Sequence, residues 1–387
     1  MARNYFKWAE VDVDALMWNM RQVRNLVGDD VKIAAVVKAN GYGHGSLEIM
    51  EYLIEAGADM IVVSSVNEAV EMRKKYKKAQ TIVLGYTPEE NVDEAIRYGV
   101  TQTVTSEVQA RILSDTAQRI GMGVSCHIKI DTGMNRIGFR VCEESADAIA
   151  RIAEMPGIHI NGMFSHFATA DEADKTFMKL QYERFCRMSE MLEERGIKTP
   201  IKHIANSAAI IDFPESFMDM VRSGIITYGI YPSDEVDKSR IELKPVLSLK
   251  SRISHIKTIE EDSGISYGLT ETVKAGSVIA TIPVGYADGY PRSLGGKAEV
   301  LIRGKRAKIK GRVCMDQFMA DISHIPEAQV GDEVVLIGRD GDEYVSVDEL
   351  AEIGNTISYE LLCMIGRRVP RIYIKDNKVI RVTDYLE

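Results

Sequence analysis

The sequence of 387 residues has few cysteines and no long apolar run. Its five cysteines include no CxxC pair, which argues against a zinc ribbon. No stretch approaches the roughly 18 uninterrupted apolar residues of a transmembrane helix. The N-terminal residues carry charges throughout and lack the apolar segment of a signal peptide. We therefore expect a protein with free thiols in the reducing cytoplasm and no membrane association.

Positive charge is also scarce: 48 Lys and Arg stand against 57 Asp and Glu, a net charge of −9. This balance argues against a dedicated nucleic-acid binder. The seven histidines show no HExxH or comparable spacing, so no metal site is expected. The length, at about 150 residues per domain, predicts two domains.

Most of the chain alternates short β-branched runs with amphipathic stretches of helical length. Strands that alternate with helices indicate βαβ units and a parallel sheet. Eight such runs favour a (β/α)8 barrel over an open doubly wound sheet. The eight runs are residues 31–37, 60–63, 81–84, 101–105, 124–130, 158–164, 202–205 and 217–221.

A polar segment with two prolines, residues 232–245, follows the last of these runs and predicts a domain boundary. Beyond it come closely spaced strand-like runs, interrupted by a single short helix at 347–355. This pattern predicts an antiparallel β domain. We therefore divide the chain into a barrel, 1–240, and a C-terminal β domain, 241–387.

Two short motifs do not fit the functions that they suggest. Residues 264–268 match GxSxG, but they lie in the β-rich half with no helix following, so a serine hydrolase is rejected. Residues 41–45, GYGHG, follow a strand like a dinucleotide loop. Their third glycine comes one residue early for GxGxxG.

Polar residues collect where the barrel strands end, which is where barrel enzymes place their sites. Lys38 follows an almost purely apolar run, so we expect a partly desolvated amine with a lowered pKa, suited to Schiff-base chemistry. Asn206-Ser207 and Ser223-Gly224 end strands 7 and 8, where many barrels bind phosphate. A lysine, phosphate donors and a ring-nitrogen partner such as Arg222 together suggest pyridoxal phosphate.

Eight segments carry a further signal: AVVKANGYGHG (35–45), HIKIDTGMNRIGF (127–139), NSAA (206–209), VRSGI (221–225), ISYG (265–268), TIPVGYADGY (281–290), GRVCMDQ (311–317) and ISYELLC (357–363). In this order and over nearly the whole chain, they resemble alanine racemases. Gly41 departs from the family, in which alanine is frequent.

The resemblance implies a two-base reaction on an amino acid held by pyridoxal phosphate. Lys38 binds the cofactor covalently and is the base on one face. Tyr267 is the base on the other face and comes from a second subunit, so a homodimer with shared sites is implied. The implied cofactor-binding residues are Lys38, Tyr42, His166, Asn206, Ser207, Arg222, Gly224, Ile225 and Tyr359. The implied substrate-binding residues are Arg136 and Met315, and the implied entrance residues are Asp171, Tyr286, Arg292 and Arg312.

Lys129 lies on the polar face of its predicted strand, near Arg136, where two cations would repel. The resemblance suggests that Lys129 reacts with CO2 to form a carbamate that holds Arg136. The alternative is an unmodified lysine paired with a carboxylate such as Asp131.

The expected function is the interconversion of L- and D-alanine for peptidoglycan precursors. A decarboxylase of basic amino acids combines a similar barrel and β domain, but Met315 and the tyrosine of ISYG fit racemases better. A non-catalytic carrier of the cofactor would resemble the barrel alone. Racemases of serine or of broader specificity often lack the lysine equivalent to Lys129 and carry an export signal, which favours alanine here.

Overall fold

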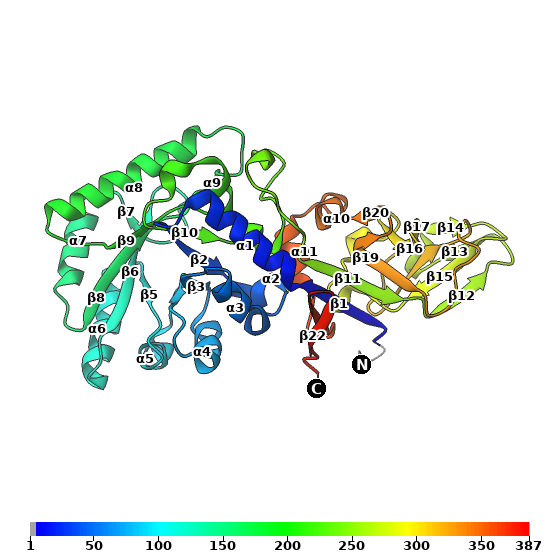
Figure 1. Ribbon diagram of the computed structural model, residues 1–387, viewed down its shortest axis with the longest axis horizontal. Helices are drawn as coiled ribbons and strands as arrows, with labels where there is room; N and C mark the ends of the chain where they lie inside the picture. The colour runs from blue at the N-terminus through cyan, green and yellow to red at the C-terminus, as the bar shows by residue number, and fades with distance from the viewer. Residues whose placement is uncertain (1–4, 387) are drawn as a thin grey trace. The chain divides into compact units, whose positions relative to one another are not determined.

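Two structural units make up the computed structural model, which describes residues 5–386 (Figure 1). The first consists of the described residues up to Ala15, Tyr42–Gly45 and the chain from Pro245 onward. The second consists of Leu16–Gly41 and Ser46–Lys244. The division expected from sequence, 1–240 and 241–387, differs at the N-terminus. The reason is that β1 (Lys7–Asp12) pairs antiparallel with β11 and parallel with β21, both in the C-terminal half.

The second unit is a (β/α)8 barrel, as the alternating pattern predicts. Two parallel sheets, in the orders β10-β2-β3-β4 and β5-β6-β8-β9, supply its strands. A parallel bridge between Ile82 and Thr101 joins them on one side. On the other side Arg222 N–H donates to the carbonyl of Ala205 at 3.1 Å, which closes the barrel. The strands are β2 (Lys32–Val36), β3 (Met60–Val63), β4 (Thr81–Val83), β5 (Gln102–Val104), β6 (Val124–Asp131), β8 (Ile158–Phe164), β9 (Ile201–His203) and β10 (Met220–Ser223).

Helices follow most of these strands and run along the outside of the barrel in Figure 1. Their ends carry ordinary sequence signals: Ser106 caps the N-terminus of α6, and Gly121 ends it in the left-handed conformation. The helices are α1 (Val13–Val27), α3 (Ser46–Glu55), α4 (Val66–Lys75), α5 (Glu89–Arg97), α6 (Glu107–Ile120), α7 (Glu143–Ala153), α8 (Thr176–Glu194) and α9 (Ser207–Asp212). A short strand, β7 (Phe139–Arg140), pairs with β6 and was not predicted.

The first unit is the expected antiparallel β domain. Its main sheet runs β12-β15-β18-β17-β16-β19-β11-β1-β21-β22, with β20 beside β19 and a separate β13-β14 pair. The strands after β1 are β11 (Leu247–Arg252), β12 (His255–Thr258), β13 (Ser263–Ile265), β14 (Glu271–Val273), β15 (Val278–Ile282), β16 (Glu299–Ile302), β17 (Lys305–Lys310), β18 (Phe318–Asp321), β19 (Glu333–Asp340), β20 (Glu343–Val345), β21 (Arg371–Lys375) and β22 (Lys378–Thr383).

The expectation of a single helix in this domain is wrong. Besides α10 (Val347–Gly354), there is a second helix, α11 (Ser358–Met364), which includes all of the segment ISYELLC except Ile357. No helix within residues 5–386 is long and apolar enough to cross a membrane. All five cysteines are free thiols.

Candidate active site

Lys38 lies two residues after the end of β2 and begins an unusual backbone turn, α2 (Lys38–Tyr42). Four successive residues, Ala39 to Tyr42, have φ values of 53°, 55°, 63° and 51°. Each L-residue in this left-handed region costs about 1–2 kcal/mol, so surrounding contacts must hold the turn. The Lys38 side chain is exposed in the single chain, and the partial desolvation of its amine stays a prediction.

Arg222, on β10, is 3% exposed, and both of its terminal nitrogens donate hydrogen bonds to protein acceptors. Nη1 donates to His203 Nδ1 at 2.9 Å and to the His203 carbonyl at 3.1 Å. Nη2 donates to the carbonyls of Ser165 and Ile204 and to His166 Nδ1, at 2.8, 3.0 and 3.1 Å. In the described residues it has no carboxylate partner, and its Nε–H has no acceptor. A buried guanidinium without an anion favours an electron-rich or anionic ligand beside it.

The histidines around Arg222 are neutral hydrogen-bond acceptors. Burial, followed by the Arg222 charge, holds the pKa of His166 and of His203 well below the usual value. Burial also lowers the pKa of His127 to about 4. Because His203 Nδ1 accepts from Arg222, its proton lies on Nε2, which donates to His127 Nδ1 at 2.9 Å. Phe164 stacks on His203 with ring centroids 4.9 Å apart, which fixes the imidazole plane.

Four cations surround His166. After burial, the charges that lower its pKa are those of Arg222, Arg136, Lys129 and Lys38. Burial and the Arg136 charge also lower the pKa of Arg222 to about 9, so the guanidinium stays largely protonated near pH 7. The carboxyl end of the barrel is therefore electropositive and suited to an anionic ligand.

Lys129 lies on β6 with a strongly perturbed amine. Burial lowers its pKa to about 7, Arg222 and Arg136 add to the effect, and Asp131 opposes it. The amine donates to the Ile130 carbonyl at 2.6 Å, and within the described residues it makes no ion pair. Asp131 Oδ1 instead accepts the N–H groups that follow it in its own turn. The structure thus offers no direct Lys129–Asp131 pair.

The starts of two short helices meet at the ends of β9 and β10. Asn206 caps α9 through a 3.1 Å bond from Ala209 N–H. Ser207 Oγ accepts from Gly224 N–H at 3.1 Å, which joins the two strand ends. Ile225 begins the 3-10 helix η2 (Ile225–Tyr228). First-turn N–H groups lack partners within their helix and can bind phosphate oxygens.

Two further predicted residues, Arg136 and Asp171, lie in loops of the barrel. Arg136 is exposed in the loop after β6, and its charge acts on both Lys129 and Arg222. Asp171 is half-buried in the loop before α8, and its carbonyl accepts from the Ser233 hydroxyl.

The β domain holds Tyr267 on an exposed loop between β13 and β14. The Tyr267 side chain is 69% exposed in the 3-10 helix η4 (Tyr267–Leu269). Ser266 before it has a φ of 63°, and its Oγ donates to the Arg312 carbonyl at 2.7 Å. The GxSxG serine therefore fixes a loop and does not form a nucleophile elbow.

Four further predicted residues lie near this loop or in the segments 286–292 and 312–315. Arg312 Nη1 lies 3.1 Å from the position of a Cβ built on Gly268, so Arg312 packs beside the Tyr267 loop. Met315 is 53% exposed, and its carbonyl accepts from Ala287 N–H at 3.0 Å. Tyr286 thus lies beside Met315, while Arg292 is exposed in the next turn.

Tyr42 and Tyr359 form a second group in the β domain, with ring centroids 6.1 Å apart. Burial and the nearby Tyr359 raise the pKa of Tyr42, which keeps its hydroxyl protonated. The backbone after Tyr42 is bound tightly: Arg371 Nε donates to the Gly43 carbonyl at 3.0 Å. A Cβ on Gly43 would lie 2.2 Å from the Leu362 carbonyl oxygen, so only glycine fits there.

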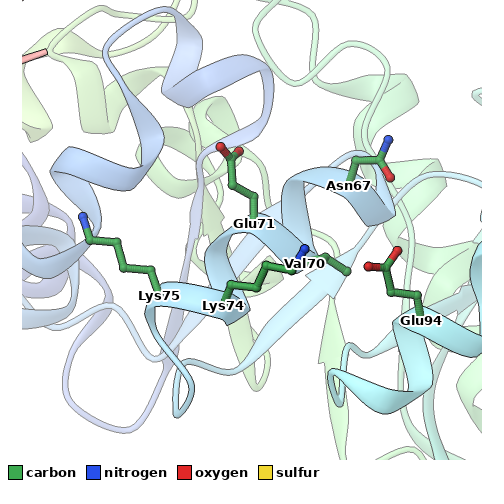
Figure 2. Close-up of a pocket in the computed structure, with 6 residues that line it drawn as sticks. All are labelled: Asn67, Val70, Glu71, Lys74, Lys75 and Glu94. Atoms are coloured by element: carbon green, nitrogen blue, oxygen red, sulfur yellow. The ribbon is translucent and has the colours of Figure 1, made fainter. Parts of the chain in front are cut away.

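A hollow of about 520 Å³ lies elsewhere, on the outer face of α4 and α5 (Figure 2). Its charged side chains include Glu71, Lys74 and Glu94, so both signs are present. It offers no convergent set of acid–base groups. We therefore assign the candidate site to the strand ends.

The sequence interpretation missed His203 and Phe164, which hold Arg222 in place. A histidine within the apolar run 201–205 was the available signal, since buried imidazoles need partners. In residues 5–386 no cluster of His, Cys, Asp and Glu could hold a metal ion.

Comparisons with protein-family models and with curated relatives point to the same family. The family described as alanine racemase, N-terminal domain, matches residues 11–232, and alanine racemase, C-terminal domain, matches residues 246–373. An alanine racemase of Clostridium perfringens strain SM101 is 46% identical over 379 residues, 98% of each chain. One of Clostridium tetani is 47% identical over 382 residues, also 98% of each.

Solved structures similar to this chain belong to the same family. An alanine racemase of Clostridium difficile 630 superposes with a TM-score of 0.95 at 42% identity, covering 99% of both chains. That of Bacillus anthracis with bound L-Ala-P gives 0.93 at 39% identity, covering 98% of both. With the family matches, the barrel and the β domain, this chain belongs to the alanine racemase family.

Proposed function

We propose that this chain interconverts L-alanine and D-alanine with pyridoxal phosphate as cofactor, and so supplies D-alanine for peptidoglycan. The main support for the proposal is Arg222, which is buried, makes no ion pair with a carboxylate of the described residues, and donates hydrogen bonds to the neutral His166 and His203. The charges of Lys38, Lys129 and Arg136 act together with that of Arg222 on the neighbouring His166. An anionic cofactor and an amino-acid carboxylate would balance this charge.

The cofactor, when bound, withdraws electrons and makes the Cα proton of an attached amino acid acidic. Lys38 supplies the amine that attaches it. The phosphate group suits the hydroxyl of Ser207 and the backbone at Asn206, Gly224 and Ile225. Tyr42 and Tyr359 add phenol hydroxyls to the phosphate group, as the resemblance implies.

Arg222 would be the residue that faces the ring nitrogen of the bound cofactor. An arginine seldom gives up its proton, so Arg222 would donate a hydrogen bond there rather than a proton. His166 and His203 hold the guanidinium in that orientation because both accept hydrogen bonds from it.

Two bases on opposite faces of Cα are required to invert the configuration. Lys38 moves the proton on one face and Tyr267 on the other. Tyr267 is supplied by a second subunit, so the functional unit is a homodimer. The exposure of the Tyr267 side chain supports this arrangement, since an exposed phenol is available to a partner.

Arg136 and the Met315 backbone orient the substrate carboxylate. Lys129 is the residue proposed to carry a carbamate that holds Arg136, and its pKa of about 7 supports this, because only the neutral amine reacts with CO2. Asp171, Tyr286, Arg292 and Arg312 line the entrance. The free cysteines support a cytoplasmic location.

Incubation of the purified protein with L-alanine in D2O tests the proposal. The expected product is D-alanine with deuterium at Cα, without release of CO2. An amine product with CO2 would indicate a decarboxylase, and inversion of serine but not alanine would change the substrate. Mass and electron density at Lys129 test the carbamate, and a bare, well-ordered amine would refute it.

A further inference from the structure

The left-handed turn after Lys38 needs an external restraint. Ala39 has a φ of 53° and a ψ of 49°, a conformation that is unfavourable for alanine. The Ala39 side chain has no polar atom that could stabilise this geometry locally. A contact from another part of the barrel must therefore hold the backbone of Ala39.

That contact comes from Glu68, the third residue of α4. Glu68 Oε1 accepts from Ala39 N–H at 2.7 Å. Its Oε2 accepts from Ser64 N–H at 2.8 Å and from Ser65 N–H at 3.1 Å. One carboxylate thus ties the residue after Lys38 to the connection between β3 and α4. Hydrogen bonds to an ionised carboxylate are stronger than neutral ones.

The bond to Ala39 is not explained by helix capping. The bond from Ser65 N–H completes the capping box of α4, in which Ser65 Oγ also accepts from Glu68 N–H. Those bonds use Oε2 and satisfy the start of the helix. Oε1 adds nothing to the helix, because Ala39 lies on a different strand connection.

We propose that Glu68 is a positioning residue for Lys38, which holds the left-handed turn so that the lysine amine is aimed at the reacting atoms. The inference rests on the proposed role of Lys38 as covalent anchor and base. If the Ala39 peptide relaxed to negative φ, the backbone at Lys38 would rotate with it. Small displacements of a catalytic group cost large factors in rate.

Glu68→Gln is the informative variant. A glutamine has one acceptor oxygen, and its NH2 group cannot accept from a backbone N–H. The single oxygen of the glutamine can accept from the Ala39 N–H group or from those of Ser64 and Ser65, but not from all three. We expect amide exchange at Ala39 to accelerate at least about tenfold and kcat to fall by about 10- to 100-fold, with the KM for alanine within about twofold.

Two variants on the same helix serve as controls. Ser65→Ala weakens the cap and leaves the Glu68–Ala39 bond in place. Glu71→Gln removes an exposed carboxylate at the hollow on the outer face of α4 (Figure 2). Both are expected to retain wild-type exchange at Ala39 and wild-type kcat.

The measurements are hydrogen exchange of the Ala39 amide and steady-state kinetics, both on the cofactor-loaded protein. Unchanged exchange in Glu68→Gln would overturn the inference, as would faster exchange with unchanged kcat. If kcat fell as much in Ser65→Ala as in Glu68→Gln, the effect of Glu68 would come from capping α4, and the inference would be wrong. If the wild type does not racemise alanine, the proposed function fails, while the exchange result still reports whether Glu68 holds the turn.

Discussion

The site residues of the barrel and those of the β domain are held in different ways. In the barrel, Arg222 is 3% exposed and its hydrogen bonds to His166 and His203 join side chain to side chain. In the β domain, Tyr267 is 69% exposed, and its position is set by the backbone of Ser266 and a hydroxyl bond to the Arg312 carbonyl.

This difference separates two tasks. Burial in the barrel keeps the histidines neutral. It also lowers the pKa of Arg222, but only to about 9, so the guanidinium remains largely protonated near pH 7. The loop of the β domain presents a hydroxyl to its surroundings and leaves it accessible. The barrel therefore sets the electrostatics around Arg222, whereas the β domain leaves the Tyr267 hydroxyl accessible, as the proposed role of Tyr267 requires.

Removal of the barrel's own base is expected to have the largest effect. Lys38→Ala eliminates both covalent attachment and one proton acceptor, so we expect racemisation to fall by at least about 10⁴-fold. Because Lys38 is exposed, the thermal midpoint of the protein without cofactor should stay the same. D-alanine formation measures the effect, and activity above a tenth of wild type would contradict the assignment.

Tyr267→Phe tests the proposed role of the exposed tyrosine in the β domain. We expect a loss of about 10²- to 10⁴-fold in racemisation with unchanged folding, because the side chain is mostly exposed. Exchange of the Cα proton in D2O should become unequal for the two enantiomers, since one base remains. Equal exchange of both enantiomers would refute the two-base scheme.

His203→Leu tests whether the barrel site depends on its buried network. The change leaves an Arg222 N–H and His127 Nδ1 without their partner, at a cost of roughly 2–4 kcal/mol. A domain of this size loses about 2–4 °C in thermal midpoint per kcal/mol. His159→Leu, at an exposed position of β8, is the control. Equal midpoints for the two variants would show that the network adds no stability.

Acidification should weaken the barrel through its neutral histidines. The pKa of His127 is about 4 in the folded chain, and the unfolded chain has the ordinary value of about 6.5. Between these values the unfolded state binds more protons, so the free energy of unfolding falls as pH decreases, by up to about 1.4 kcal/mol per pH unit for each such histidine. Thermal midpoints between pH 7.5 and 5 measure this slope. His203→Leu should reduce the slope, and an identical slope would count against neutral burial.

The barrel strands could be predicted because each is a local apolar run bounded by helix and turn signals. The meeting of Ser207 and Gly224 was also predictable, since the carboxyl ends of parallel strands share one edge. The place of β1 was not, because its partners lie more than 200 residues away in sequence. Nor was the left-handed turn after Lys38, since it depends on contacts such as that from Glu68.

The central claim is that Lys38 of one chain works with Tyr267 of another. Co-expression of a Lys38→Ala chain with a Tyr267→Phe chain tests it, because a mixed dimer would contain one intact pair. Random pairing predicts recovery to about one quarter of wild-type activity, as half of the dimers are mixed and each has one working site of two. Activity no higher than the sum of the two separate variants would contradict the shared site.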